Sequence, residues 1–260
     1  TPTAVGAAMI ASTFDGPSSA GETLHVVNLA FEVTRIDLPI HEVRHSRKIW
    51  NHADEMRVDA DVAARLARNG VRMGAVGQDA WPAIHAILNA GHAKVRTDQV
   101  LAHSGLPVTL EVGVVSTSEA IFSYDHSSRL VGKTFTVGDK IVMLDYALDP
   151  AASGRVDVRV SLEVRHDRGI MTWEQNQDTF RQVPVCDRHV FGDLRVALTL
   201  NAGEALLIGP GMEAENEYLV GSRFFMGQTA GEQYEVLYCV NPVPYQQPGG
   251  RTQTGERNVE

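Results

Sequence analysis

The clearest structural signal in the chain is the stretch Val-Asp-Val-Arg-Val-Ser-Leu-Glu-Val at residues 156–164. Apolar and polar side chains alternate strictly along it, which is typical of a β-strand because successive side chains point to opposite faces. One face is aliphatic and the other polar, so we expect an antiparallel sheet with one buried face and one wet face. Asp157 and Glu163 fall on the wet face. We interpret them as charge pairs with Arg159 and Arg165, within or between strands, rather than as paired catalytic carboxylates.

Other segments carry similar strand signals. Residues 194–200 alternate in the same way, and Asn-Ala-Gly-Glu at 201–204 predicts a hairpin turn into a further strand at 205–208. The last strand is expected at 234–240, where the chain is again rich in apolar residues. From residue 93 onward the pattern is almost entirely β.

Two helices are predicted before that point. The first occupies 59–68, with acidic residues in its first turn and arginines in its last, and it ends at Gly70. The second begins at Asp79 as the N-cap residue, has Pro82 in its first turn and ends at Gly91. These positions suit the helix dipole and the usual capping preferences.

The resulting fold class is α+β, predominantly antiparallel β with two helices in the N-terminal third. An apolar-rich run at 24–40 predicts the first strand, and the short segment 71–76 predicts another between the helices. We divide the chain into a flexible lead-in at 1–22, a β-rich core at 23–242 and a loose tail at 243–260.

The composition argues against several classes of partner. Lys and Arg total 23 against 32 Asp and Glu, which gives a net charge of −9. A nucleic-acid binder needs a basic surface to displace counterions from phosphates, and anionic lipid surfaces impose a similar requirement. No stretch approaches the roughly 18 apolar residues of a membrane-spanning helix. We therefore expect no nucleic-acid partner.

The chain has two cysteines, Cys186 and Cys239. Two thiols are too few for a disulfide framework or for a four-ligand zinc site by themselves. Cys239 lies in the apolar segment 236–240, so we interpret it as a buried, unreactive thiol. A disulfide between the two cysteines is the alternative.

One motif could carry metal chemistry. His41, Glu42 and His45 form the pattern H-E-x-x-H, which on a helix gives two zinc ligands on one face and a carboxylate that activates water. Pro39 and the preceding β-run leave little room to start a helix, and His52 does not have the spacing of a third ligand. We interpret the segment as exposed and polar, with a zinc-dependent hydrolase as the alternative function.

The order of these pieces resembles the core domain of secretins, the ring-forming proteins of bacterial outer-membrane secretion systems and pili. The similar segments are an opening strand at 26–33, a helix followed by Ala-Lys-Val at 86–95, a strand pair closing on Val-Gly at 107–113, a glycine-opened strand at 203–209, a Gly-x-x-Phe stretch at 220–225 and a final strand ending on Pro at 235–242. The chain departs from the family in an insertion at 44–70 with an extra helix. It also departs at 114–140, which is short for membrane-crossing hairpins plus a gate.

The resemblance implies a structural subunit of a homo-oligomeric ring or channel in the bacterial envelope, without catalysis, metal or cofactor. It also implies a location in the outer membrane or periplasm, with a signal peptide already removed. The partners it implies are copies of the same chain and other envelope proteins. Strands around 137–148, 156–164, 194–208 and 234–240 are expected to complete the oligomeric barrel or ring, since closure satisfies strand edges. A monomeric β-sandwich binding module is a third possibility, beside the hydrolase.

Overall fold

The structure is a computed structural model. It describes residues 29–40, 45–102, 106–148, 154–176, 179–229 and 231–244. The predicted lead-in at 1–22 lies outside these ranges, as does all of the predicted tail except residues 243–244.

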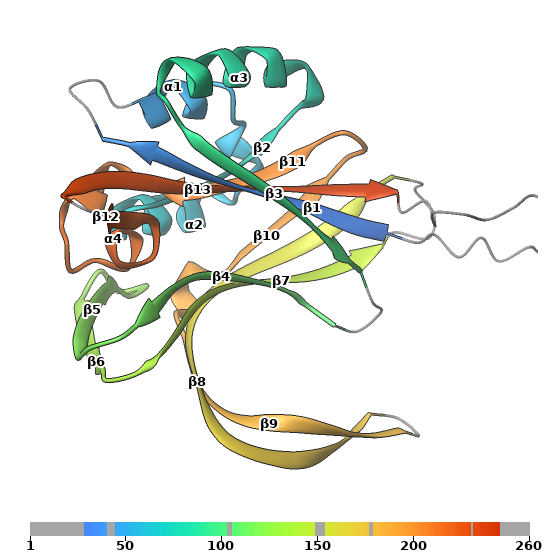
Figure 1. Cartoon of the computed structure of the whole chain (residues 1–260), viewed down its shortest axis with the longest axis vertical. Helices are drawn as coiled ribbons and strands as arrows, with labels where there is room; N and C mark the ends of the chain where they lie inside the picture. Colours follow the sequence, from blue (N-terminus) through green and yellow to red (C-terminus); the bar gives the residue numbers. More distant parts are fainter. Residues whose placement is uncertain are drawn as a thin grey trace, which may run out of the picture.

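Two antiparallel β-sheets face one another, and helices cover the outer face of one of them (Figure 1). The first sheet has the order β2 (Val71–Val76), β11 (Ala205–Pro210), β13 (Glu232–Pro244), β1 (Leu29–Pro39) and β3 (Lys94–Leu101), with β12 (Met226–Thr229) also paired to β13. The second has the order β10 (Val196–Leu200), β8 (Val156–Asn176), β7 (Gly138–Leu148) and β4 (Val108–Val115), with β9 (Thr179–Val190) paired to β8. Strands β5 (Glu119–Tyr124) and β6 (Leu130–Phe135) form a separate hairpin. The predicted predominance of antiparallel β-structure is confirmed.

Short helices connect the strands. The α-helices are α1 (His45–Trp50), α2 (Ala60–Arg68), α3 (Trp81–Ala90) and α4 (Val220–Phe225), and the 3₁₀ turns are η1 (Glu55–Arg57), η2 (Gln78–Ala80), η3 (Gly192–Leu194) and η4 (Met212–Glu215). Helices α2 and α3 match the two predicted helices. Helix α1, inside the predicted insertion at 44–70, and helix α4 were not predicted.

The main core lies between the two sheets. Phe31 and Leu206 of the first sheet belong to the same buried cluster as Leu144 and Leu162 of the second. The aliphatic face of segment 156–164 is buried along its whole length, as its alternation predicted. This part of the sequence therefore folds as its pattern requires.

A second core covers the other face of the first sheet. Leu207 and Leu237 of that sheet contact a cluster that includes Ile49 of α1 and Ile84 of α3. Strand β11 is consequently buried at every residue, which explains its continuous apolar sequence.

The capping of the two predicted helices differs. The Asp59 side chain accepts hydrogen bonds from the amides of Asp61 and Val62 and caps α2, one residue before the helix that was predicted to include it. Asp79 was predicted to cap α3, and this is wrong: it lies inside η2, and α3 follows directly from that 3₁₀ turn, with Pro82 at its start. The continuous helical turn leaves no extended residue at position 79 to act as an N-cap.

The turn at 201–204 is present but does not make a hairpin. The Glu204 amide donates to the Asn201 carbonyl at 3.0 Å, yet β10 pairs with β8 in one sheet and β11 pairs with β13 and β2 in the other. The chain crosses between the sheets here, because β10 buries one face and β11 buries both. The predicted hairpin pairing is wrong.

The strands that were expected to complete a ring are mostly occupied within the chain. The 156–164 part of β8 lies between β7 and β10, and the 234–240 part of β13 lies between β1 and other strands of the first sheet. Strands β7 and β11 are also paired on both sides. Among these strands, only β10 ends a sheet in the described part of the chain. The paired edges of the other strands are therefore occupied within the chain in this conformation, and the oligomeric ring stays a prediction.

One feature extends beyond the two sheets. Strand β8 is 21 residues long, and beyond residue 165 it pairs only with β9 in the described chain. Residues 166–176 of β8 and 179–187 of β9, which we call the arm, curve away below the sheets in Figure 1.

Candidate functional site

The arm has one apolar face that is open to solvent. The register pairs Met171 with Pro184, Trp173 with Gln182 and Gln175 with Phe180. Residues that pair directly share a face, as do residues two apart on one strand, so Met171, Trp173 and Phe180 lie on the same face. Their exposed fractions are 54%, 65% and 65%. Such a cluster of large exposed apolar side chains is typical of an interaction surface.

The opposite face of the arm is more polar. The register assigns it Thr172 and Val183 together with positions Glu174 and Arg181. The arm is therefore amphipathic, like a strand pair that packs against something on one side only. The signal in the sequence is a separate short alternation, Met171-Thr172-Trp173-Glu174, which begins after the polar residues 165–169.

A buried ion-pair cluster anchors the base of the arm. Glu163 accepts hydrogen bonds from Arg165 at 2.6 Å and from the Arg188 Nη2 of β9 at 2.7 Å, and its exposed fraction is 0%. The predicted pairing of Glu163 with Arg165 is thus confirmed, but the prediction that Glu163 lies on a wet face is wrong. The second strand of the arm brings Arg188 over this position and excludes water.

A second pair lies just beyond it. A bulge between Asp167 and Met171 redirects β8, and Gly169 adopts a positive φ of 68° within it. Arg168 donates two hydrogen bonds to the Asp187 carboxylate of β9. The guanidinium hydrogen bonds lower the pKa of Asp187, so the pair stays ionised at neutral pH and fixes the two strands after the bend.

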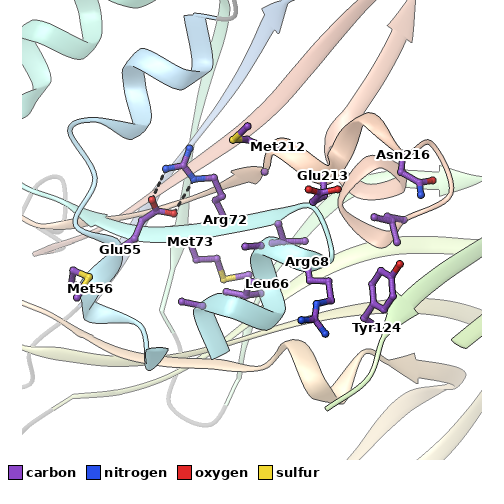
Figure 2. Close-up of a pocket in the computed structure, with 15 residues that line it drawn as sticks. Glu55, Met56, Leu66, Arg68, Arg72, Met73, Tyr124, Met212, Glu213 and Asn216 are labelled. Atoms are coloured by element: carbon purple, nitrogen blue, oxygen red, sulfur yellow. Dashed lines mark hydrogen bonds and ion pairs between the residues drawn. The ribbon is translucent and has the colours of Figure 1, made fainter. Parts of the chain in front are cut away.

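A groove lies on another part of the molecule, between α2, β2, η4 and the end of β5 (Figure 2). Its volume is about 870 Å³. The apolar lining includes Leu66, Met73 and Leu219, which are buried, and Met56 and Met212, which are 90% and 65% exposed. Exposed methionines beside an apolar groove are suited to adaptable binding, because the thioether side chain is flexible and polarisable.

Three charged side chains of the groove, Glu55, Arg68 and Arg72, already have partners within the chain. Glu55 accepts a hydrogen bond from the Arg72 Nε at 2.9 Å and a second from its Nη2, as Figure 2 shows. The Arg72 guanidinium lies 4.6 Å from the Trp50 ring centroid, and that of Arg68 lies 5.8 Å from the Tyr124 ring centroid. The groove is thus chemically suited to apolar and aromatic side chains.

Buried backbone contacts hold the groove wall. Asn69, which is fully buried, donates to the Tyr124 carbonyl at 3.1 Å and accepts from the Tyr124 amide at 2.7 Å. The Gly221 amide donates to the Asn69 carbonyl at 2.9 Å, and the Gly211 amide to the Gly70 carbonyl at 2.8 Å. These contacts connect α2 to β5 and α4, so the wall has a defined position.

A third charged cluster ties α4 to the sheets. Lys140, which is buried, donates to the Glu119 carboxylate at 2.8 Å and to the Arg223 carbonyl at 2.9 Å. The Arg223 Nε lies 3.4 Å from the same Glu119 oxygen. With both basic groups on one carboxylate, the cluster is suited to holding β5, β7 and α4 together rather than to proton transfer.

The H-E-x-x-H motif falls mostly outside the described residues. His41 and Glu42 are not described, and His45 is the first residue of the six-residue helix α1. His52 lies in the turn after that helix, half-buried. Within the described ranges, no three His, Cys, Asp or Glu residues are grouped so that they could hold a metal ion. The zinc interpretation is untested.

The two cysteines are free thiols, so the alternative of a disulfide between them is wrong. Cys239 is buried in the core between the first sheet and its helices, as predicted, and burial raises the pKa of its thiol. Cys186 lies at the base of the arm and is half-buried.

Comparisons with models of protein families, with curated proteins and with solved structures found no match. The resemblance to secretins therefore stays a prediction. The helices in the described part of the chain are too short or too polar to cross a lipid bilayer.

Proposed function

We propose that this chain is a structural subunit that assembles with copies of itself, through the apolar face of its arm. The resemblance to secretins implies a closed ring in the bacterial envelope as the form of that assembly. We assign no catalytic role to any residue. The single observation that carries the proposal is the exposed apolar face formed by Met171, Trp173 and Phe180.

The size of this face suits a protein interface. A fully buried aromatic side chain covers roughly 150–250 Å², so Trp173 and Phe180, each 65% exposed, with Met171 supply on the order of 300 Å². A standard interface buries about 800 Å² per partner. The arm is therefore large enough to be the centre of an interface, and Trp is among the residues that contribute most binding energy there.

The exposed edge of the first sheet is a weaker candidate. Strand β3 ends that sheet and is exposed along most of its length. Lys94, Arg96 and Asp98 are exposed along it, and charged residues on an edge strand discourage pairing with another chain. We therefore expect assembly to depend on the arm rather than on this edge.

The mass of the particle in solution tests the proposal. Light scattering of the purified protein, with and without mild detergent, is expected to give a discrete multiple of 28.3 kDa. A mass of one chain at all concentrations up to about 100 µM would contradict self-assembly.

The sandwich of two sheets and the groove of about 870 Å³ favour a second candidate. This is a monomeric binding module whose ligand is held in the groove, a cavity of a size common for ligand sites. A monomeric particle would support it over the structural subunit.

A further inference from the structure

The groove and the arm have complementary surfaces on one chain. The groove presents an apolar lining flanked by exposed methionines, and the arm presents exposed aromatic side chains. We propose that the groove of each copy receives the arm of a neighbouring copy, with Trp173 and Phe180 between Met56 and Met212. This inference rests on the proposed self-assembly and names the surface that the arm contacts.

The chemistry of the two surfaces supports the match. Sulfur–aromatic contacts are favourable when a methionine thioether lies about 5 Å from a ring, and the groove offers Met56, Met73 and Met212 for such contacts. A pocket of roughly 300–1,000 Å³ holds a drug-sized molecule, and the side chains of one Trp and one Phe are together of that size.

Desolvation of the groove leaves few charged groups unpaired. Glu55 and Arg72 already pair with one another, and Arg68 already donates to the Ser128 hydroxyl. Covering these groups with an apolar arm therefore does not remove their partners, whereas burying an unpaired charge is costly. The exposed Glu213 and Asn216 at the groove border remain available for Gln182 on the same face of the arm.

The kind of contact decides which assemblies can form. Arm and groove are different surfaces: Figure 1 shows the arm curving away from the sheets, whereas the groove is lined by α2 and by β2 of the first sheet. A contact between unlike surfaces closes as a ring, of which two copies that exchange arms are the smallest, or continues as an open filament when the rotation between neighbours does not close. Pairing of two arms with each other would instead stop at a dimer.

Cysteine crosslinking tests the contact directly. In a Cys186→Ser background, the pair Gln182→Cys and Glu213→Cys puts one thiol on the apolar arm face and one at the groove border, leaving the aromatic anchors and methionines intact. Mild oxidation is expected to give a non-reducing gel ladder at multiples of the chain mass. Each single variant should give no ladder, and Thr172→Cys with Glu213→Cys controls for the opposite face of the arm.

Filling the groove gives an independent test. Ala67 lines the groove on α2, whereas Ala64 is exposed on the same helix outside it. Light scattering is expected to show that Ala67→Trp reduces the particle to single chains and that Ala64→Trp does not. Circular dichroism of both variants checks that α2 and the sheets still fold.

The outcomes separate this inference from the proposed function. The arm-to-groove contact would be overturned if the assembly stays intact, the double-cysteine variant gives no ladder, and Gln182→Cys alone forms a covalent dimer. That result would show that arms pair with arms. A crosslinked species at the mass of one chain would overturn it as well. Absence of any assembly in the parent protein would overturn the proposed function itself.

Discussion

At the scale of single residues, Glu163 shows that a polar position in an alternating strand can still be buried. Its position in the 156–164 pattern predicted a wet face, but Arg188 arrives from β9 and covers it. Because the carboxylate is fully buried between two guanidinium groups, its loss leaves both arginines without their shared partner.

We expect Glu163→Gln to lower the free energy of unfolding by roughly 2–3 kcal/mol, since removing one partner of a buried ion pair is destabilising. The loss is moderate because both arginine side chains still reach water. Asp157→Asn on the same strand is the matched control, because Asp157 is exposed and accepts one hydrogen bond from Thr199. Urea denaturation measures both. Equal losses for the two variants would contradict the special role of the buried carboxylate.

The cysteines give a second prediction at this scale. Burial raises the pKa of the Cys239 thiol, so at pH 8.5 it stays protonated and is also out of reach of reagents. Mass spectrometry after iodoacetamide treatment is expected to find one adduct per native chain, on Cys186, and two after denaturation. Rapid labelling of Cys239 in the folded protein would contradict the packing of the second core.

At the scale of elements, the sequence predicts which strands exist better than how they pair. The helix-start signal at Asp59 and the alternation of 156–164 are local, and both are confirmed. The turn at 201–204 is local too, but the sheet that each flanking strand joins depends on distant partners. The continuous apolar run of β11 was the available signal, because a strand buried on both faces belongs in the middle of a covered sheet.

The candidate sites were not predicted. The groove collects residues from α2, β2, η4 and β5, which are far apart in the sequence, so no local spacing could reveal it. The arm could have been found, since Met171 and Trp173 alternate with more polar residues. Helices α1 and α4 have six residues each, too few for a clear helical period.

The junction of α4 with α2 provides a test at the same scale. A side-chain carbon added to Gly221 would overlap the Gly70 carbonyl oxygen, so we expect Gly221→Ala to destabilise the protein by about 2 kcal/mol or more. Gly192→Ala is the control, because a carbon added there meets nothing within 4 Å. Thermal unfolding compares them. A Gly221→Ala protein as stable as the control would contradict the close packing of this junction.

At the scale of the whole molecule, the described part of the chain pairs most of its strand edges internally and leaves the apolar face of the arm exposed. The sandwich supplies a packed body, because both faces of the central strands of the first sheet are covered. The ion pairs of Glu163 and Asp187 hold the arm at its base. This combination suits a subunit whose arm binds a neighbouring copy through its apolar face.

The most direct test of this account compares the particle mass of the parent protein with that of a variant carrying Trp173→Ser and Phe180→Ser. Thr172→Ser, on the opposite face of the arm, is the control. Light scattering is expected to show a discrete multiple of 28.3 kDa for the parent and the control, and a single chain for the double variant. An assembly that survives loss of both aromatic side chains would contradict the role of the arm.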